Sequence, residues 1–110
     1  MTHEMKLAES AFKAIFGGDK RVEMRLYDQK RTAIKVGDSI VFTNIVSGEQ
    51  GMVKVRGLHV FPSFANLYVT YSPKVLGYAE GEKAHPDDML KYYPREKQIK
   101  YGVVAIEIDV

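Results

Sequence analysis

The sequence predicts an α+β fold in a single domain that spans residues 1–110. Apolar residues fall at helical spacing between Ala8 and Phe16, which predicts one amphipathic helix. Apolar and polar residues alternate in segments 22–26 and 103–109, as in half-buried strands. Glycine-containing turns separate these and other short runs of β-forming residues. A chain of 110 residues is long enough for one compact core and not for two.

The first third of the chain predicts a helix followed by a strand. Residues 4–7 form a brief strand or a lead-in to the helix, which covers residues 8–16. Gly17-Gly18 ends this helix, because glycine adopts the backbone conformations of a helix end without steric cost. The first full strand is Val22 to Leu26.

The middle of the chain predicts two strands joined by a turn. Residues 27–36 are polar and basic and predict a loop that ends in the turn Gly37-Asp38. Residues 39–44 are rich in β-formers and predict a strand, and residues 47–51 predict a turn. A third strand runs from Val53 to Val60, and the parity of its apolar positions changes at Gly57. This change indicates a bulge or a sharp bend.

The last third of the chain predicts short helices before a final strand. Ser63 is the expected N-cap of a short helix through Tyr68, and residues 71–83 read as an exposed loop. Pro86 starts a further helix that Pro94 ends, and residues 95–100 allow one helical turn. The total is four or five strands, expected to form an antiparallel sheet, and two or three short helices.

The composition excludes several classes of protein. The chain has no cysteine, so disulfides, thiolate metal sites and cysteine nucleophiles are excluded. No apolar run approaches the roughly 20 residues that span a bilayer, and the N-terminal residues lack the order of a signal peptide. We therefore expect a cytoplasmic protein with no membrane partner.

The charge is distributed unevenly along the chain. The formal net charge is only +2. Within residues 17–35, however, six basic residues stand against three acidic ones. A basic patch of this kind attracts phosphate, although a charged loop that keeps the protein soluble explains it equally well.

The predicted strand at residues 22–26 is the best candidate for a functional site. Val22, Met24 and Leu26 share one face, which we expect to be buried. Glu23 and Arg25 then stand together on the other face. Lys20 and Arg21 lie at the start of the strand. The alternative is a solvated strand face, in which the two charges stabilise little.

The same stretch carries a family resemblance. Gly18-x-Lys20-x-x-Glu23-x-Arg25-x-x-Asp28 is followed by Gly37-Asp38-x-Ile40-x-Phe42, by Ser63-Phe64 and by Tyr101-Gly102-Val103-Val104-Ala105-Ile106. This series resembles the activating-signal-cointegrator homology (ASCH) domain, which belongs to the PUA-like superfamily of small β-barrels. The resemblance covers most of the chain. It implies a small mixed or antiparallel barrel with two or three peripheral helices, whose motif lines a cleft between the barrel and the helices.

The resemblance implies binding of RNA or of a modified nucleoside in a basic cleft. Lys20, Arg21 and Arg25 would contact phosphate or a base edge, Glu23 would orient Arg25 or accept from a base amine, and Tyr27 would stack on a base. The alternative is an enzyme at the same site, either a nucleoside amidohydrolase or a metal-independent ribonuclease, with Lys20 and Glu23 as its catalytic residues.

One departure from the related enzymes weighs against catalysis. Small acetylcytidine amidohydrolases of this superfamily use a lysine, a threonine three residues later and a distant glutamate. Lys20 matches the lysine, but the threonine position is Glu23, and a carboxylate cannot replace a hydroxyl nucleophile. No residue aligns with the distant glutamate; the acids in that region are Glu82, Asp87 and Asp88.

Other residues carry weaker signals. Tyr78, Tyr92, Tyr93 and Tyr101 sit in or beside polar segments, where an exposed ring can stack on a base and a half-buried one caps the core. The three histidines lack metal-ligand spacing. We predict no metal and no cofactor.

Overall fold

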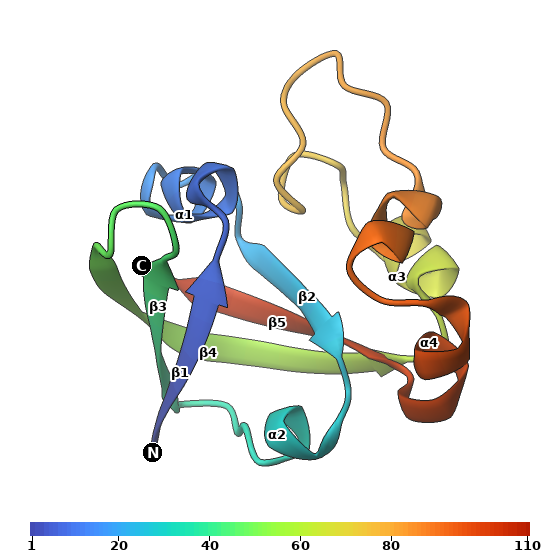
Figure 1. The fold of residues 1–110 in the computed structure, drawn as a ribbon, viewed down its shortest axis with the longest axis horizontal. Helices are drawn as coiled ribbons and strands as arrows, with labels where there is room; N and C mark the ends of the chain where they lie inside the picture. Colours follow the sequence, from blue (N-terminus) through green and yellow to red (C-terminus); the bar gives the residue numbers. More distant parts are fainter.

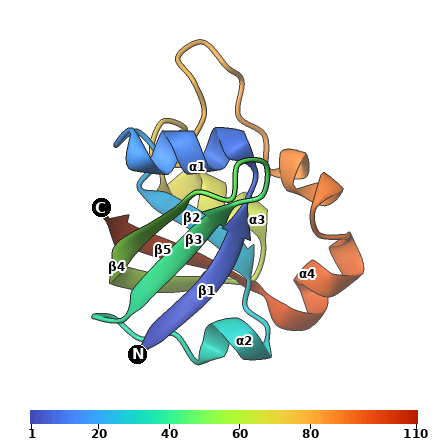
Figure 2. The same ribbon diagram turned by 60° about the vertical axis from the view of Figure 1, so that its left-hand side comes forward.

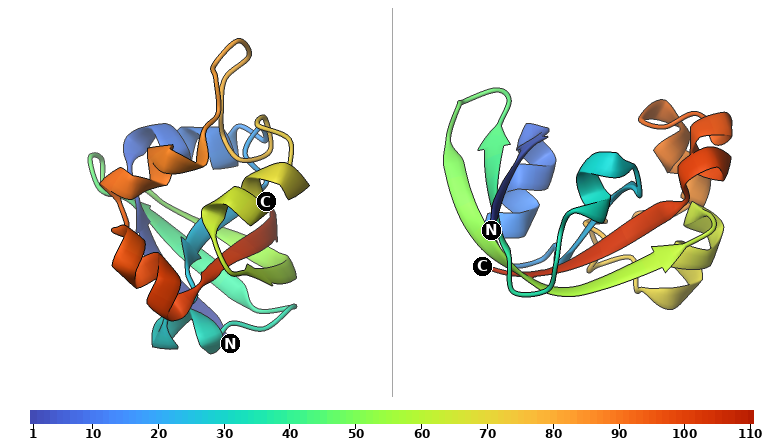
Figure 3. Two further views of the ribbon diagram at one scale, coloured as in Figure 1. Left: turned by 90° about the vertical axis from the view of Figure 1, so that its right-hand side faces the viewer. Right: turned by 90° about the horizontal axis from the view of Figure 1, so that it is seen from below.

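A computed structural model describes all 110 residues, and five strands form its one curled sheet (Figure 1). In spatial order they are β1 (Thr2–Leu7), β3 (Ser39–Asn44), β4 (Gln50–Phe61), β5 (Val103–Asp109) and β2 (Val22–Leu26). The sheet bends into a half-barrel, which is clearest from below in Figure 3, with β1 and β2 as its two ends. The predicted α+β class and barrel-like sheet are confirmed.

One strand pair departs from the antiparallel sheet that the sequence predicted. β1 pairs with β3 in parallel, whereas the β3–β4, β4–β5 and β2–β5 pairs are antiparallel. Parallel neighbours need a crossover connection, and here the chain passes through a helix, through β2 and through a second short helix before it returns to β3. The sequence predicted only strands joined by tight turns, which form antiparallel pairs, and it did not predict this long connection.

Five helical segments surround the sheet (Figures 1 and 2). They are α1 (Glu9–Phe16), α2 (Gln29–Thr32), α3 (Phe64–Thr70), the 3-10 helix η1 (Pro86–Lys91) and α4 (Arg95–Tyr101). α1 lies near the start of β4, and α3, η1 and α4 gather at the other end of β4 and β5 (Figure 3).

The number of helices exceeds the two or three that were predicted. α2 lies in the segment predicted as a loop. It has no buried residue, so the sequence contains no apolar stripe that would predict a helix there. It is held instead by its N-cap, where the Asp28 carboxylate accepts from the backbone N–H of Arg31 at 3.2 Å. α4 is longer than the single turn expected, and η1 ends at Lys91 rather than at Pro94, which is the N-cap of α4.

Three local predictions are confirmed. Ser63 caps α3, and its hydroxyl accepts from the backbone N–H of Asn66. Pro86 opens η1. The register of β4 against β5 shifts between Val55 and Gly57, as the change of parity indicated. Gly57 lies directly against the end of the Glu107 side chain, which would have to move to make room for any larger residue at the bulge.

The core consists of two apolar clusters on opposite faces of β5. Val104, Ile106 and Ile108 pack into a cluster with α1, β1, β3 and β4. Val103 and Ala105 pack into a second cluster with β2, α3 and η1. Because β5 is covered on both sides, nearly all of its residues are buried.

β2 turns its apolar and charged residues to different sides of the sheet. Val22, Met24 and Leu26 join the second cluster, as predicted. Glu23 and Arg25 lie opposite Ile106 and Val104 in the β2–β5 register. Since directly opposed residues share a face, the two charged side chains point to the side of the first cluster, within the curl of the sheet.

Candidate functional site

The charged side chains of β2 form a buried ion triad. One Glu23 oxygen, Oε1, lies 3.0 Å from Lys20 Nζ. The other, Oε2, lies 2.7 Å from Arg25 Nη2 and accepts a hydrogen bond from Arg25 Nε at 2.9 Å. The side chains of Lys20, Glu23 and Arg25 are only 11%, 5% and 13% exposed. The solvated strand face that the sequence left open is therefore not the arrangement found.

The triad keeps Glu23 ionised. Burial by itself would raise the pKa of Glu23, but the charges of Lys20 and Arg25 and their hydrogen bonds outweigh it and hold the pKa below its usual value. Burial would likewise lower the pKa of Arg25, and the Glu23 carboxylate raises it above its usual value. Both oxygens of Glu23 are engaged, so this carboxylate positions the two cations.

Arg25 also links the two ends of the half-barrel. Its Nη2 donates to the backbone carbonyl of Lys6 at 2.9 Å. Lys6 belongs to β1 and Arg25 to β2, which are not neighbours in the sheet. We call this gap between β1 and β2 the seam; one guanidinium spans it.

A cavity of about 750 Å³ opens beside the triad, and we call it the main cavity. It is bounded by the end of β1 and the start of α1, by β2, by the loop between α3 and η1, and by η1 itself. Its charged lining consists of five basic and three acidic side chains: Lys6, Lys20, Arg25, Lys83, Lys91, Glu23, Glu82 and Asp88. The lining therefore carries a surplus of two positive charges.

Four tyrosines form the wall of the main cavity opposite β1 and α1. Tyr68 comes from α3, Tyr78 from the loop, and Tyr92 and Tyr93 directly follow η1. Tyr92 is 58% exposed, and Lys91 Nζ lies 5.1 Å from the centre of its ring. Tyr93 stacks on Phe64 of the second core cluster, so its ring is fixed from behind.

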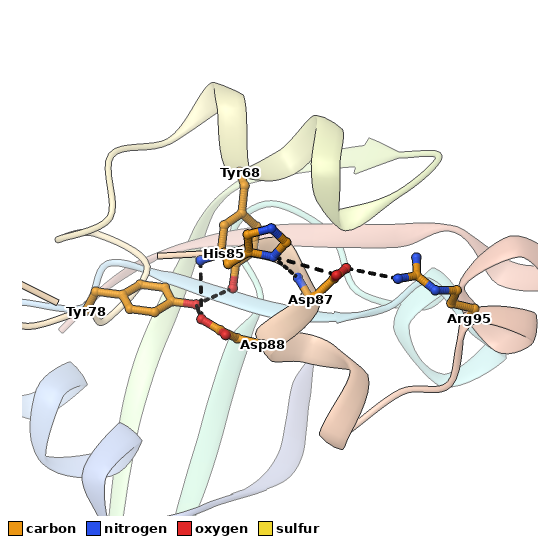
Figure 4. A network of polar contacts seen from close by, with 6 residues as sticks. All are labelled: Tyr68, Tyr78, His85, Asp87, Asp88 and Arg95. Carbon is orange, nitrogen blue, oxygen red and sulfur yellow. Dashed lines mark hydrogen bonds and ion pairs between the residues drawn. The ribbon is translucent and has the colours of Figure 1, made fainter. Parts of the chain in front are cut away.

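A hydrogen-bond network holds this wall together (Figure 4). The hydroxyls of Tyr68 and Tyr78 lie 2.7 Å apart, and Tyr78 donates to the Asp88 carboxylate at 2.7 Å. Asp88 also accepts from the backbone N–H of His85, the N-cap residue of η1, and so completes a capping box. The network thus ties the irregular loop to α3 and to η1.

The network sets the protonation of its members. Burial raises the pKa of Tyr78, and its hydrogen bonds to Tyr68 and Asp88 raise it further. The hydrogen bond from Tyr78 contributes most to lowering the pKa of Asp88 below its usual value. Tyr78 therefore stays a neutral donor and Asp88 an ionised acceptor at neutral pH.

The structure brings together three of the five residues that the sequence singled out for binding. Lys20, Glu23 and Arg25 line the main cavity, whereas Arg21 and Tyr27 do not. Arg21 is exposed, and Tyr27 packs against the first core cluster. Of the acids noted near the expected glutamate position, Glu82 and Asp88 line the main cavity and Asp87 does not.

Sequence reasoning missed several lining residues. Tyr68 was read only as part of a short helix, and Lys6, Lys83 and Lys91 carried no motif. Tyr78, Tyr92 and Tyr93 were noted as tyrosines beside polar segments, and that was the one usable signal. Their convergence depends on how α3 and η1 pack, which the local sequence does not encode.

Two further properties bear on the class of site. No three or more of the histidine, aspartate and glutamate side chains gather closely enough to hold a metal ion. None of the helices is long and apolar enough to cross a bilayer.

The chain matches known proteins along nearly its whole length. The hypothetical protein PH0355 is 38% identical over 99% of this chain and 98% of its own, with a TM-score of 0.86. Protein PF0455 from Pyrococcus furiosus is 36% identical over 99% of this chain and 96% of its own, with a TM-score of 0.72. No curated protein matches the chain significantly.

More distant structures share the fold alone. An ASCH protein from Zymomonas mobilis is 15% identical, with a TM-score of 0.68 over 97% of this chain and 66% of its own. An ASCH domain from Lactobacillus crispatus is 16% identical, with a TM-score of 0.62 over 99% of this chain and 79% of its own. The family model of the ASCH domain matches residues 5–110. This chain therefore belongs to the ASCH domain family.

Proposed function

We propose that this protein binds RNA or a modified nucleoside, with one base held in the main cavity. The observation that carries the proposal is the meeting of two different walls in one hollow. One wall presents the cations Lys20 and Arg25, and the other presents tyrosine rings. The ASCH family is generally thought to bind RNA, which favours the same ligand class.

The size of the main cavity suits a nucleoside. Sites for small molecules and cofactors generally measure roughly 300–1,000 Å³, and this one measures about 750 Å³. Part of its lining is exposed to solvent, Tyr92 included, so a base can enter while its ribose and phosphate stay outside. A splayed-out base is the part of single-stranded RNA that proteins read most specifically.

The triad supplies donors to the ligand. Lys20 directs one of its three N–H groups at Glu23, which leaves two for phosphate or carbonyl oxygens. Glu23 acts as a positioning residue, because both of its oxygens are already occupied by the cations. A preorganised cation loses less entropy on binding than a free surface lysine does.

The opposite wall supplies a stacking surface and an acceptor. Tyr92 is exposed at the mouth, where its ring can stack on a base of any identity. Asp88 is held ionised by Tyr78 and can accept from a base amine. Together the two walls offer donors on one side and an acceptor on the other, which matches the edge of a nucleobase.

No observation favours the enzymatic alternative. A general base works best when its pKa lies near the working pH, and the pKa of Glu23 is held below its usual value instead. Glu23 also stands where the related amidohydrolases use a threonine. A nucleoside amidohydrolase or a ribonuclease that uses Lys20 and Glu23 therefore has less support than binding.

The first test uses a matched pair of exposed tyrosines. Tyr92 and Tyr101 each have a lysine over the ring, at 5.1 and 5.2 Å, but only Tyr92 lines the main cavity. We expect Tyr92→Ala to weaken binding of a labelled RNA hexamer about 5- to 150-fold, since stacking on one base is worth roughly 1–3 kcal/mol. Tyr101→Ala should leave the affinity unchanged.

Fluorescence anisotropy with a random-sequence hexamer measures both variants against the original protein, and free nucleosides serve as competitors. If the two tyrosine variants bind alike, or if neither RNA nor any nucleoside binds, the main cavity is not the binding site and the proposal is wrong.

A further inference from the structure

A second hollow lies on the other side of Arg25, and we call it the basic groove. It measures about 410 Å³ and is lined by Glu4, Met5, Lys6, Arg25, Lys30, Arg31 and Thr43. Lys6 and Arg25 line the main cavity as well. The two hollows therefore meet at the seam, where Arg25 spans from β2 to the carbonyl of Lys6.

The basic groove has a different character from the main cavity. Four of its seven lining residues are cations, one is an acid, and Met5 is the single apolar side chain. It offers no ring for a base and little apolar surface to bury. Binding there would be electrostatic, which suits the backbone of a nucleic acid.

Arg31 is only partly satisfied within the protein. Its Nη1 donates to Asp28 at 3.0 Å, while its Nε is buried and has no hydrogen-bond partner. A buried donor without an acceptor costs stability. Its neighbour Lys30 is exposed and has no ion-pair partner. Since both side chains line the basic groove, an anion bound there would give the Arg31 guanidinium a second partner beside Asp28 and give Lys30 a counter-charge.

The two hollows line up along the seam. The main cavity is bounded by the start of α1, and the basic groove by α2. Figure 1 shows α1 and α2 at opposite ends of the space between β1 and β2. A ligand that follows the seam thus leaves the tyrosine wall, crosses Arg25 and reaches Lys30 and Arg31.

We infer that the ligand is a strand of RNA rather than a free nucleoside, with a base in the main cavity and an adjoining phosphate in the basic groove. The inference rests on the proposed function and extends it to the substrate class. Arg25 and Lys6 sit at the junction between the two subsites. A free nucleoside would fill the main cavity and leave the cations of α2 unused.

The test measures affinity as a function of ligand length. Pools of free nucleosides, dinucleotides and hexanucleotides compete with a labelled random-sequence RNA hexamer. We expect dinucleotides and hexamers to bind about tenfold or more tightly than nucleosides, because only they carry a phosphate that can reach the groove.

The double variant Lys30→Ala/Arg31→Ala should weaken hexamer binding and leave nucleoside binding unchanged. It should also reduce the slope of log K against log salt by about 0.7, the contribution of one phosphate contact on a single strand. Lys54→Ala/Arg56→Ala is the matched control, because it removes the same charges from β4 outside both hollows. Lys30→Glu, at an exposed position, tests the groove without disturbing the Arg31–Asp28 pair.

Affinity that does not depend on length, or a salt slope that is unchanged in both α2 variants, would overturn this inference. If nucleosides still bind and Tyr92→Ala still weakens their binding, the proposed function stands without this inference. If no RNA or nucleoside binds at all, both fail.

Discussion

At the scale of single residues, the arrangement of β2 follows from the cost of burying charge. Glu23 and Arg25 alternate with apolar residues, so they share the face opposite the second core cluster. That face lies within the curl of the sheet, where an unpaired charge would be costly. Each charge of the triad is stable there because the opposite charge is present. The same ion pairs also fix the positions of Lys20 and Arg25, the donors that we assign to the ligand.

Arg25→Ala should therefore lower the free energy of unfolding by about 3–5 kcal/mol, the usual cost of leaving one member of a buried ion pair alone. Arg56→Ala is the control, because Arg56 lies 3.6 Å from Asp109 in an exposed pair. Its removal should cost less than about 1 kcal/mol. Urea denaturation measures both.

A further variant separates lost charge pairing from lost packing. Lys20→Met, Glu23→Gln and Arg25→Met combined remove all three charges of the triad at similar volume and should recover part of the loss. If Arg25→Ala and Arg56→Ala have equal effects, the triad contributes no more to stability than a surface pair does.

At the scale of elements, Asp38 ties β1 to the turn that precedes β3. Its Oδ2 lies 2.8 Å from His3 Nε2 and accepts from the backbone N–H of Lys35 at 3.0 Å. These hydrogen bonds, that from His3 first, lower the pKa of Asp38 to about 2. The contact lies where the parallel pairing begins, with Thr2 opposite Ser39.

The pKa of Asp38 gives a definite pH dependence. Because folding lowers it from 3.8 to about 2, Asp38 contributes stability above pH 4. That stability is lost as the pH falls from about 4 towards 2, where the folded form also takes up the proton. We expect Asp38→Asn to be less stable than the original protein at pH 5 and to lose less stability on acidification.

Urea midpoints between pH 2 and pH 5 measure this difference, with Asp19→Asn as the control, because Asp19 is exposed and forms no ion pair. Parallel pH profiles for the original protein and Asp38→Asn would show that Asp38 does not make this contribution.

At the scale of the whole molecule, the half-barrel leaves β1 and β2 with one partner strand each. The seam between them is spanned by the single hydrogen bond from Arg25 to Lys6. β5, in contrast, is hydrogen-bonded on both sides and covered on both faces. Stability should therefore be lowest at the seam, where the main cavity and the basic groove meet.

Native-state hydrogen exchange by NMR tests this gradient. We expect the amides of β4 and β5 to exchange slowest and the paired amides of β1 and β2 faster, since edge strands open without global unfolding. Arg25→Lys keeps a cation beside Glu23 but loses the planar fork that reaches Lys6. It should therefore speed exchange in β1 and β2 more than in β5. Equal protection of all five strands would contradict the gradient.

The local sequence determined most of the elements but not their number. Periodicity and turn residues were sufficient for α1, for β2 to β5, for the Ser63 cap and for the bulge at Gly57, whereas β1 was left open as a strand or a lead-in over residues 4–7. The sequence did not predict α2, because this helix buries no residue and therefore has no hydrophobic periodicity. It depends on one capping side chain. The sequence did not predict the parallel β1–β3 pair either, because this pairing depends on a long crossover connection between the two strands.

By itself the sequence placed Lys20, Glu23 and Arg25 together, because strand alternation and short separation act within one segment. Only the tertiary structure decided what faces them. The Tyr68–Tyr78–Asp88 network and the groove beside α2 are assembled from segments far apart in the chain. Their meeting depends on how two core clusters pack against β5, and that packing is a property of the whole chain.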